Sequence, residues 1–275
     1  MPGVAQSLYV RTLQERTHMT SELHSEITNL LQTYRPISLE AMKSVKLMNR
    51  IDTKYLLPLP TLVELLRMAR GDYKVQETNG VRTPEYHTVY LDTPGREMYH
   101  RHHSGCRVRQ KIRLRTYCDT GDSFLEVKNK NNHGRTDKRR IHISSLEAME
   151  QEGAGEFLAS HALYTLGQLR PDLENTFRRI TLVNQRMTER LTIDLGLEFH
   201  DLEADSRAAL PAIAIVELKR DGRTASPIRR ALHLLHVQPA SFSKYCIGCA
   251  LTNPRLKQNR FKKNIRQAQR LSTTK

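Results

Sequence analysis

Aromatic side chains are scarce in this sequence. Tryptophan is absent, and the ten Tyr and six Phe among 275 residues are not interleaved with the basic runs. Surfaces that bind single-stranded nucleic acid need aromatic side chains on which the bases stack. We therefore expect no specific nucleic-acid partner.

Long apolar runs and cysteines are scarce too. The longest mostly apolar stretch, 208–216, has nine residues and contains Pro211. A helix that crosses a bilayer needs about 20 apolar residues, so we expect no transmembrane span. The N-terminus lacks the apolar stretch of a secretory signal, and four cysteines in so long a chain do not make a disulfide framework. A reducing, cytoplasmic setting follows as the expectation.

Acidic residues are outnumbered by basic ones. The 44 Lys and Arg against 29 Asp and Glu give a net charge of +15. Between Cys106 and Arg140 there are eleven basic and four acidic residues, and the segment after Asn253 has eight basic residues and no acidic one. Such an excess predicts a polyanionic partner, whether nucleic acid, polyphosphate, nucleotide or an acidic membrane.

Hydrophobic periodicity predicts a chain made mostly of strands, with helices between some of them. We expect strands at 45–57, 72–79, 84–92, 106–117, 123–131, 138–144, 174–184, 188–201 and 212–220. Helices are expected around 23–34 and 60–69, the second with a proline near its start, and near 95–103, 145–168, 226–237 and 241–252. Residues 119–122 supply a hairpin turn.

The strand at 106–115 is the most informative segment. Its odd positions are Arg107, Arg109, Lys111, Arg113 and Arg115, and its even positions are mainly apolar. Strand side chains alternate between faces, so five cations line one face. Four other strands divide in the same way, with polar faces made by Arg50, Asp52 and Lys54; by Glu126, Lys128 and Lys130; by Arg190, Thr192 and Asp194; and by Glu217 and Lys219.

A sheet with one solvated face also alternates, but such a face mixes Ser, Thr, Gln, Lys and Glu. Here arginine and lysine dominate, and like charges along one strand repel, so an anion is expected between them. The apolar faces need cover, which the helices supply. The sequence therefore predicts an α+β fold: a closed or nearly closed antiparallel β-barrel with a cationic lumen and helices packed outside.

Several segments carry a resemblance to a known family. In chain order they are 47–55, 88–93, 113–115, 124–128, 134–139, 190–194, 216–219 and 241–245. Over about residues 45–248 the sequence resembles the vacuolar transporter chaperone (VTC) domains, which are polyphosphate polymerases. The resemblance implies the fold of the triphosphate tunnel metalloenzyme superfamily, an antiparallel barrel whose bore binds triphosphate. That fold agrees with the barrel inferred from alternation.

The resemblance also implies roles for individual residues. Glu217 matches the metal-binding glutamate, and Lys244, next to Ser243, matches the catalytic lysine. The phosphate-binding residues would be Lys54, Arg113, Arg115, Lys128, Lys138, Arg179 and Arg190, with Arg178 as the alternative to Arg179. Further residues of the lumen would be Arg50, Glu126, Lys130, Lys219 and Ser243.

The implied reaction transfers the terminal phosphoryl group of ATP to a growing polyphosphate chain, with Mn²⁺ or Mg²⁺ as cofactor. Phosphoryl transfer depends on positioning and charge neutralisation, which arginine and lysine supply. One carboxylate suffices for the metal, because phosphates and waters complete its coordination. Two alternatives stay open: a tripolyphosphatase or nucleoside triphosphatase on the same barrel, and a non-enzymatic module that binds polyanions.

For domain organisation we expect a flexible N-terminus at 1–20, one catalytic barrel at 21–253 and a basic tail at 254–275, solvated or loosely helical. The regulatory domain and membrane helices of eukaryotic family members are not seen, so the sequence resembles a short form. We expect a cytoplasmic enzyme whose tail docks onto a membrane protein or an anionic leaflet, where each Lys or Arg contributes about 1 kcal/mol. Ser241 stands where family members often have a basic residue.

Two further groups of residues invite a metal or redox interpretation. His100, His102 and His103 fall in a polar loop or short helix without partners at ligand spacing. Cys246 and Cys249 have redox-motif spacing but no βαβ context, so we interpret them as packing residues of a helix.

Overall fold

The computed structural model describes residues 3–42, 50–133, 136–222 and 225–273. Its helices are α1 (Gly3–Gln32), α2 (Leu39–Met42), α3 (Leu59–Ala69), α4 (Glu97–His103), α5 (Ala154–His161), α6 (Pro227–Leu234), α7 (Lys244–Thr252) and α8 (Lys262–Thr273), with 3₁₀ turns η1 (Leu166–Gln168) and η2 (Asn259–Phe261). Its strands are β1 (Arg35–Ser38), β2 (Arg50–Pro58), β3 (Tyr73–Glu77), β4 (Glu85–Asp92), β5 (Arg109–Tyr117), β6 (Ser123–Lys130), β7 (Thr136–His142), β8 (Arg170–Asn184), β9 (Glu189–Asp201), β10 (Ser206–Leu210) and β11 (Ile213–Asp221).

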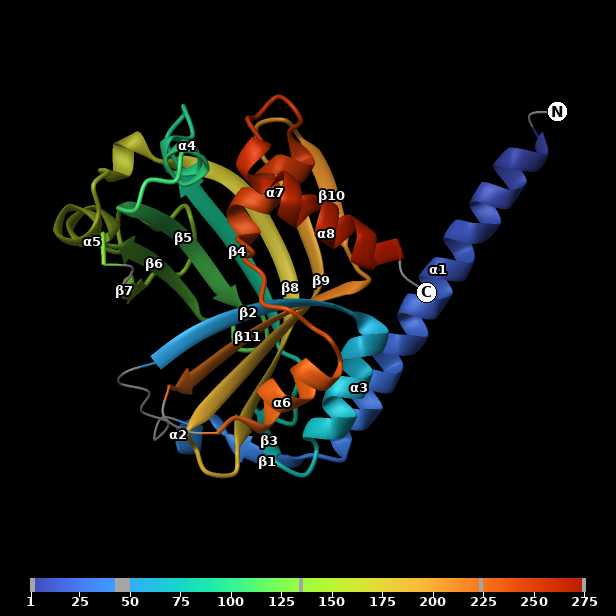
Figure 1. Cartoon of the computed structure of the whole chain (residues 1–275). Helices are drawn as coiled ribbons and strands as arrows, with labels where there is room; N and C mark the ends of the chain where they lie inside the picture. The colour runs from blue at the N-terminus through green and yellow to red at the C-terminus, as the bar shows by residue number, and fades with distance from the viewer. Residues whose placement is uncertain (1–2, 43–49, 134–135, 223–224, 274–275) are drawn as a thin grey trace.

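The antiparallel architecture with helices outside is confirmed (Figure 1). The main sheet runs β2-β11-β9-β8-β4-β5-β6-β7, and each neighbouring pair in it is antiparallel. The sheet is strongly curled: Lys54 on β2 and Lys111 on β5 bond the adjacent residues Phe242 and Ser243, although four strands separate β2 from β5. Among the described residues β2 and β7 do not pair, so the curled sheet stays open along one side.

A β-bulge divides the interior of the curled sheet into two parts. The register of β8 with β9 shifts between Thr176 and Arg178, where Gly196 has a φ of +58°. The extra residue on β9 changes which side chains face inward, a known effect of bulges. Before the bulge Asp194 faces inward, and after it Leu197 and Phe199 take part in an apolar cluster. One part of the interior is therefore charged and the other apolar.

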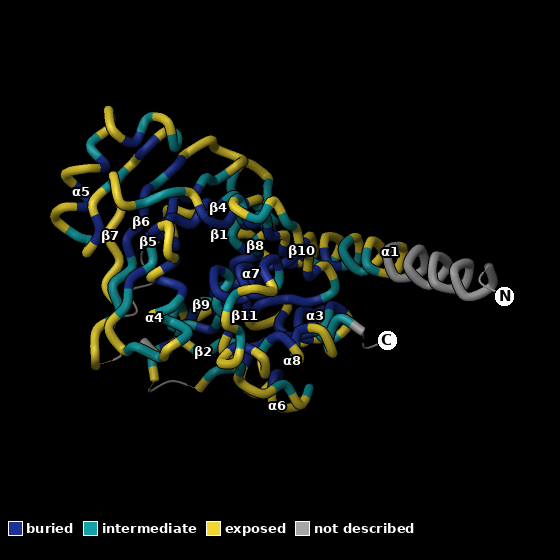
Figure 2. The backbone as a smooth tube through the Cα atoms, turned by 90° about the horizontal axis from the view of Figure 1, so that it is seen from above, coloured by how far each residue is buried: buried dark blue, intermediate teal, exposed yellow. Residues whose placement is uncertain are grey.

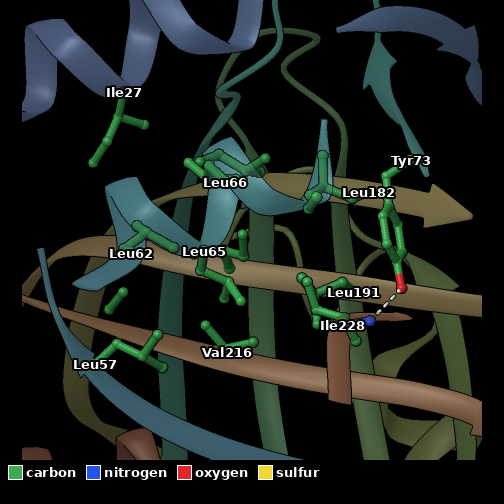
Figure 3. Packing of buried hydrophobic residues seen from close by; sticks show 14 of the residues in the cluster. Ile27, Leu57, Leu62, Leu65, Leu66, Tyr73, Leu182, Leu191, Val216 and Ile228 are labelled. Atoms are coloured by element: carbon green, nitrogen blue, oxygen red, sulfur yellow. Dashed lines mark hydrogen bonds between the residues drawn. The ribbon is translucent and has the colours of Figure 1, made fainter. Parts of the chain in front are cut away.

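Helices α1, α3 and α6 cover the outer face of β2, β11, β9 and β8. Leu62, Leu65 and Leu66 of α3 pack towards Leu191 and Val216 of the strands, as Figure 3 shows. Such leucines, with Pro60 near the helix start, give α3 the amphipathic pattern that the sequence predicts. The outer face of β4, β5 and β6 is covered by α5 through a separate cluster.

Helix α7 lies inside the curve of the sheet and fills the apolar part of the interior. Residues 245–250 are buried, as the colour of α7 in Figure 2 indicates. In the same cluster are Phe177, Leu197 and Phe199. Cys246 and Cys249 belong to the same cluster, which is the packing role expected for them. The wet, charged part of the interior is thus closed at one end by side chains.

The two ends of the chain are helical. Helix α1 starts at Gly3, within the stretch for which the sequence predicts flexibility, and its first turns extend away from the body of the molecule (Figure 1). Of the two states expected for the segment after Asn253, solvated or loosely helical, the structure shows the helical one: η2 and α8 form there, and Phe261, Ile265 and Ala268 are buried against the α7 cluster. No helix in the described ranges is both long and apolar enough to span a membrane.

Candidate functional site

The charged part of the interior gathers residues from eight elements. We call this set the cationic interior: Lys54, Lys111, Arg113, Arg115, Lys128, Lys138, Arg179, Lys219 and Lys244, with the carboxylates Glu126, Asp194 and Glu217. Strand register brings them together, because it sets Arg113 opposite Glu126, Arg179 opposite Asp194 and Lys54 opposite Glu217. Each carboxylate thereby meets cations from more than one position.

Glu126 is held between Arg113 and Lys138. The Arg113 Nε and Nη2 atoms donate to Glu126 Oε2 at 2.8 and 2.5 Å, and Lys138 Nζ contacts the other oxygen. Burial alone would raise the pKa of Glu126, but the charges of Arg113, Arg115 and Lys138 hold it well below its ordinary range. Glu126 is therefore ionised and orients two of the cations.

Asp194 is the centre of a second group. Arg179 donates from Nε and Nη2 to its two oxygens at 2.6 and 2.8 Å, a two-point contact, and Lys244 Nζ contacts Oδ2. Lys244 Nζ also lies 4.3 Å from the centre of the Phe177 ring. Burial lowers the pKa of Lys244 to about 7, in spite of the Asp194 charge. Lys244 can thus change its protonation state near neutral pH.

Glu217 has two lysines as its ion-pair partners within the described part of the chain. Lys219 Nζ contacts its Oε2, and Lys54 Nζ lies 3.8 Å from Oε1. Burial opposes ionisation, but Lys219 and Lys54 lower the pKa of Glu217 to about 2. A lysine ammonium is a single charge on a flexible stem, unlike the planar guanidinium of arginine. Of the three carboxylates, Glu217 is the one whose partners can be displaced with least rearrangement.

Several cations of the interior meet no carboxylate at ion-pair distance within the described residues. Arg115 donates from Nε to Thr88 Oγ1 at 3.2 Å, and its guanidinium lies 5.5 Å from the Tyr86 ring. Lys128 stands opposite Lys111 on β5 and Lys138 on β7. The charge of Arg113, then burial, puts the pKa of Lys128 well below its ordinary value. An anion placed here would relieve repulsion that the protein alone leaves uncompensated.

The start of α7 fixes Lys244 in place. Ser243 is the N-cap and accepts from the backbone N–H of Cys246 at 3.2 Å, the bond expected of a serine at this position. Lys111 Nζ donates to the same hydroxyl at 2.8 Å. On the other side, the Tyr245 hydroxyl contacts the buried Asp92 and Asp172 at 2.5 and 2.8 Å. Lys244 and Tyr245 therefore bond different carboxylates at the helix start.

The structure also places the other residues expected at the site. Of the two alternatives Arg179 and Arg178, Arg179 is part of the cationic interior, whereas Arg178 is exposed and lies 3.8 Å from Glu85. Arg190 stands opposite Lys219 in the pairing of β9 with β11. Arg50 and Lys130 lie at strand ends. Arg50 on β2 stands opposite Asp221 on β11, and Lys130 on β6 stands opposite Arg109 on β5.

Two residues of the interior were not among the expected site residues. Asp194 binds both Arg179 and Lys244, and Lys111 bonds Ser243. Both lie on the polar faces that alternation identifies, so the signal was in the sequence. Which lysine or aspartate meets which partner depends on strand register and on the curl, neither of which alternation specifies.

Residues 49–253 match the family model described as VTC domain. Among solved structures the chain is similar to an assigned adenylate cyclase from Vibrio parahaemolyticus, at 14% identity over 72% of this chain and 97% of that one, with a TM-score of 0.43. An assigned adenylate cyclase from Bacillus halodurans is 13% identical over 78% of this chain and 100% of that one, with a TM-score of 0.46. An assigned adenylyl cyclase from Hippeastrum with dominant triphosphatase activity is 15% identical over 73% of this chain and 95% of that one, with a TM-score of 0.40. The comparison with curated proteins finds no match.

Proposed function

The chain belongs to the VTC domain family, and on this premise we propose that it is a polyphosphate polymerase that transfers the terminal phosphoryl group of ATP to a growing polyphosphate chain. The observation that carries the proposal is the convergence of nine Lys and Arg side chains around Glu126, Asp194 and Glu217 in one interior. Phosphoryl transfer needs charge neutralisation and positioning above all. This interior supplies both.

The residues divide the work by position. Arg113 and Arg115 on β5, with Lys128 on β6 and Lys138 on β7, bind the non-reacting phosphates of the nucleotide. Arg179 and Lys244, oriented by Asp194, face the transferred phosphoryl group and neutralise charge that develops on it. Lys54, Lys219 and Arg190 complete the binding of the chain from the β2–β11–β9 side.

The state of the carboxylates favours a phosphate acceptor over water. A general base works best with a pKa near the operating pH. Here Glu126, Asp194 and Glu217 each have a pKa below the ordinary value, in spite of burial, because cations surround them. They are poor bases for activating water. The terminal phosphate of a polyphosphate chain is already anionic and needs no base.

Glu217 is the residue that would hold a divalent metal. Its lysine partners can move aside, and phosphate oxygens with waters would supply the remaining oxygen ligands that Mg²⁺ and Mn²⁺ prefer. Among the described residues no three His, Cys, Asp or Glu side chains form a metal site of their own, which fits a metal that arrives with the nucleotide. When bound, the metal supplies charge stabilisation on the phosphate oxygens.

The proposal places the enzyme at the cytoplasmic face of a membrane. Lys262, Lys263 and Arg266 are exposed on α8, while Ile265 and Ala268 face the protein. This basic face is the contact for an anionic leaflet or a membrane protein. Fractionation of cells at low and high salt tests it: release only at high salt supports docking, and full solubility at both argues against it.

The direct test of the activity is incubation of the protein with ATP and Mn²⁺ or Mg²⁺, followed by a gel stained for polyphosphate. A ladder of long chains supports the polymerase. Orthophosphate without chains supports the triphosphatase alternative, and neither product supports a module that only binds polyanions. Arg113→Gln should abolish the ladder, whereas Arg178→Gln, at an exposed position outside the cationic interior, should leave it unchanged.

A further inference from the structure

A second group of cations lies beyond the cationic interior, around the side chain of His102 on α4. Burial, and then the charges of Lys111, Arg109, Lys130 and Arg260, lower the pKa of His102 to about 3, so these four cations all act on one imidazole. We call Arg109, Lys111, Lys130 and Arg260 the His102 basic group. It combines residues from β5, β6 and the segment after Asn253.

The group is built by specific contacts. His102 Nδ1 lies 2.9 Å from Cys246 Sγ on α7, and its ring packs edge-on against Phe261, with the ring centres 5.7 Å apart. Gly105, with a φ of +79°, leaves room for Arg260: a Cβ on this residue would lie 2.5 Å from Arg260 Nη1. The packing of η2 against α4 therefore brings Arg260 next to Gly105, just after α4, where its charge acts on His102 together with the charges of Arg109, Lys111 and Lys130.

The His102 basic group differs from the cationic interior in its lack of carboxylates. Arg109 stands directly opposite Lys130, and Lys111 opposite Lys128, so like charges face each other across β5 and β6. In the part of the chain that the structure describes, none of the group's four cations has a carboxylate within ion-pair distance. Like charges directly opposite on a sheet are destabilising. A bound anion would remove that cost.

Lys111 connects the two sets. Its ammonium donates to Ser243 beside Lys244, and it also acts on His102. Arg113 and Arg109 are four residues apart on one strand, which corresponds to about 13 Å along β5. A ligand that reaches from one to the other must be an extended polyanion.

We propose that the His102 basic group is a second binding site for the phosphate chain, which holds the phosphates distant from the reacting end of the growing polymer. The proposal rests on the proposed function and adds the direction of the chain: from the cationic interior along β5 and β6 towards α4 and η2. A triphosphate held between Arg113 and Arg179 reaches no further than Lys111, whereas a long chain also reaches Arg109, Lys130 and Arg260. The site therefore distinguishes ligands by length.

The experiment measures calorimetric affinities for tripolyphosphate and for long-chain polyphosphate at the same salt concentration. The test variant is Arg109→Gln with Lys130→Gln and Arg260→Gln. The control is Arg186→Gln with Arg207→Gln and Arg230→Gln, three exposed positions with the same change of charge. We expect the test variant to lose at least about tenfold in affinity for the long chain, the size of one or more charged hydrogen bonds, and to bind tripolyphosphate as the wild type does.

Equal losses for both ligands, or an unchanged long-chain affinity, overturn the proposal. So does a control variant that loses as much as the test variant, because net charge alone would then explain the effect. The measurement is separate from the activity assay. If the protein makes no polymer but the test variant still loses long-chain binding selectively, the second site stands and the polymerase proposal fails.

Discussion

At the scale of single residues, the kind of cation decides what each carboxylate of the interior can do. Glu126 and Asp194 each accept two N–H groups of one arginine, whose rigid fork fixes the geometry. Among the described residues, the ion-pair partners of Glu217 are lysines, one of them 3.8 Å away. The first two carboxylates are orienting groups, and Glu217 is the exchangeable one.

Glu217→Gln should abolish metal-dependent turnover while leaving the fold intact. The change removes the carboxylate that we propose as the metal's protein ligand and disturbs no packed core. We expect activity to fall by about a hundredfold or more, as for the loss of one preorganised charge-stabilising group. Glu198→Gln, an exposed carboxylate on β9, is the control. Normal metal-dependent activity of Glu217→Gln would contradict the role given to this residue.

Lys244 should take up a proton when triphosphate binds. Burial lowers the pKa of Lys244 to about 7 and that of Lys111 to about 8, and a phosphate anion raises both again. At pH 8 we expect uptake of about one proton per triphosphate, measured by calorimetry in buffers of different ionisation enthalpy. Lys244→Met should remove most of it. Buffer-independent heats in the wild type would refute the shift.

The same two lysines give the free protein a defined pH dependence. Their pKa values are lower in the folded state than in the unfolded chain, so between pH 7 and 10 the unfolded chain binds more protons. Stability should therefore rise with pH across this window. Thermal unfolding at pH 7, 8 and 9 checks the direction, and Lys244→Met should flatten the trend.

Alternation in the sequence identifies the polar faces but not the contacts made there. Arg113, Arg115 and Lys128 fall on the predicted inner face because side-chain direction follows from position along a strand. That Asp194 binds both Arg179 and Lys244 depends on strand register and on where α7 begins. These are properties of the folded sheet, so spacing along the chain does not contain them.

At the scale of elements, the C-terminal segment shows what composition leaves open. Its eight basic residues allow either a solvated tail or a loose helix, whereas in the structure Phe261, Ile265 and Ala268, at spacings of four and three, bury one side of the segment. The edge strand β10 is not predicted, because its small residues give a weak alternation. The long strands β8 and β9 and the helix α3 are predicted well, since their apolar periodicity is sustained.

Phe261→Ala should destabilise the protein although the residue lies in the basic tail. Its ring is buried against Tyr99 and His102, with centres 5.7 Å apart in both cases. Removing a buried phenylalanine side chain costs about 3 kcal/mol or more. Urea unfolding measures the loss, with the exposed Lys262→Ala as the control. A change below about 0.5 kcal/mol, as for an exposed position, would show that the tail does not pack.

At the scale of the whole molecule, folding encloses charges that repel one another. The net charge is +15, and the bulge at Gly196 separates the charged part of the interior from the apolar part that α7 fills. The apolar clusters on both faces of the sheet hold the fold together against this repulsion. Such an interior is preorganised for an anion, because the cost of gathering the cations is met by packing elsewhere.

Tripolyphosphate should therefore stabilise the whole fold, and salt should weaken that effect. At about a hundred times its dissociation constant a ligand adds about 2.7 kcal/mol, and for a domain of this size that raises Tm by about 5 to 10 °C. The screening length falls from about 30 Å at 0.01 M salt to about 3 Å at 1 M, so the shift should shrink as salt rises.

Scanning fluorimetry with and without tripolyphosphate at three salt concentrations tests both parts of this prediction. Arg115→Gln should reduce the shift. Arg115 contacts Thr88 and aromatic rings, and among the described residues it has no carboxylate at ion-pair distance, so the substitution leaves no carboxylate unpaired. Arg178→Gln, on the outer face, should keep the full shift. Of the two substituted arginines, Arg115 lies in the interior that the curled sheet encloses and Arg178 does not. The same shift in the wild type and both variants would therefore mean that the anion binds elsewhere.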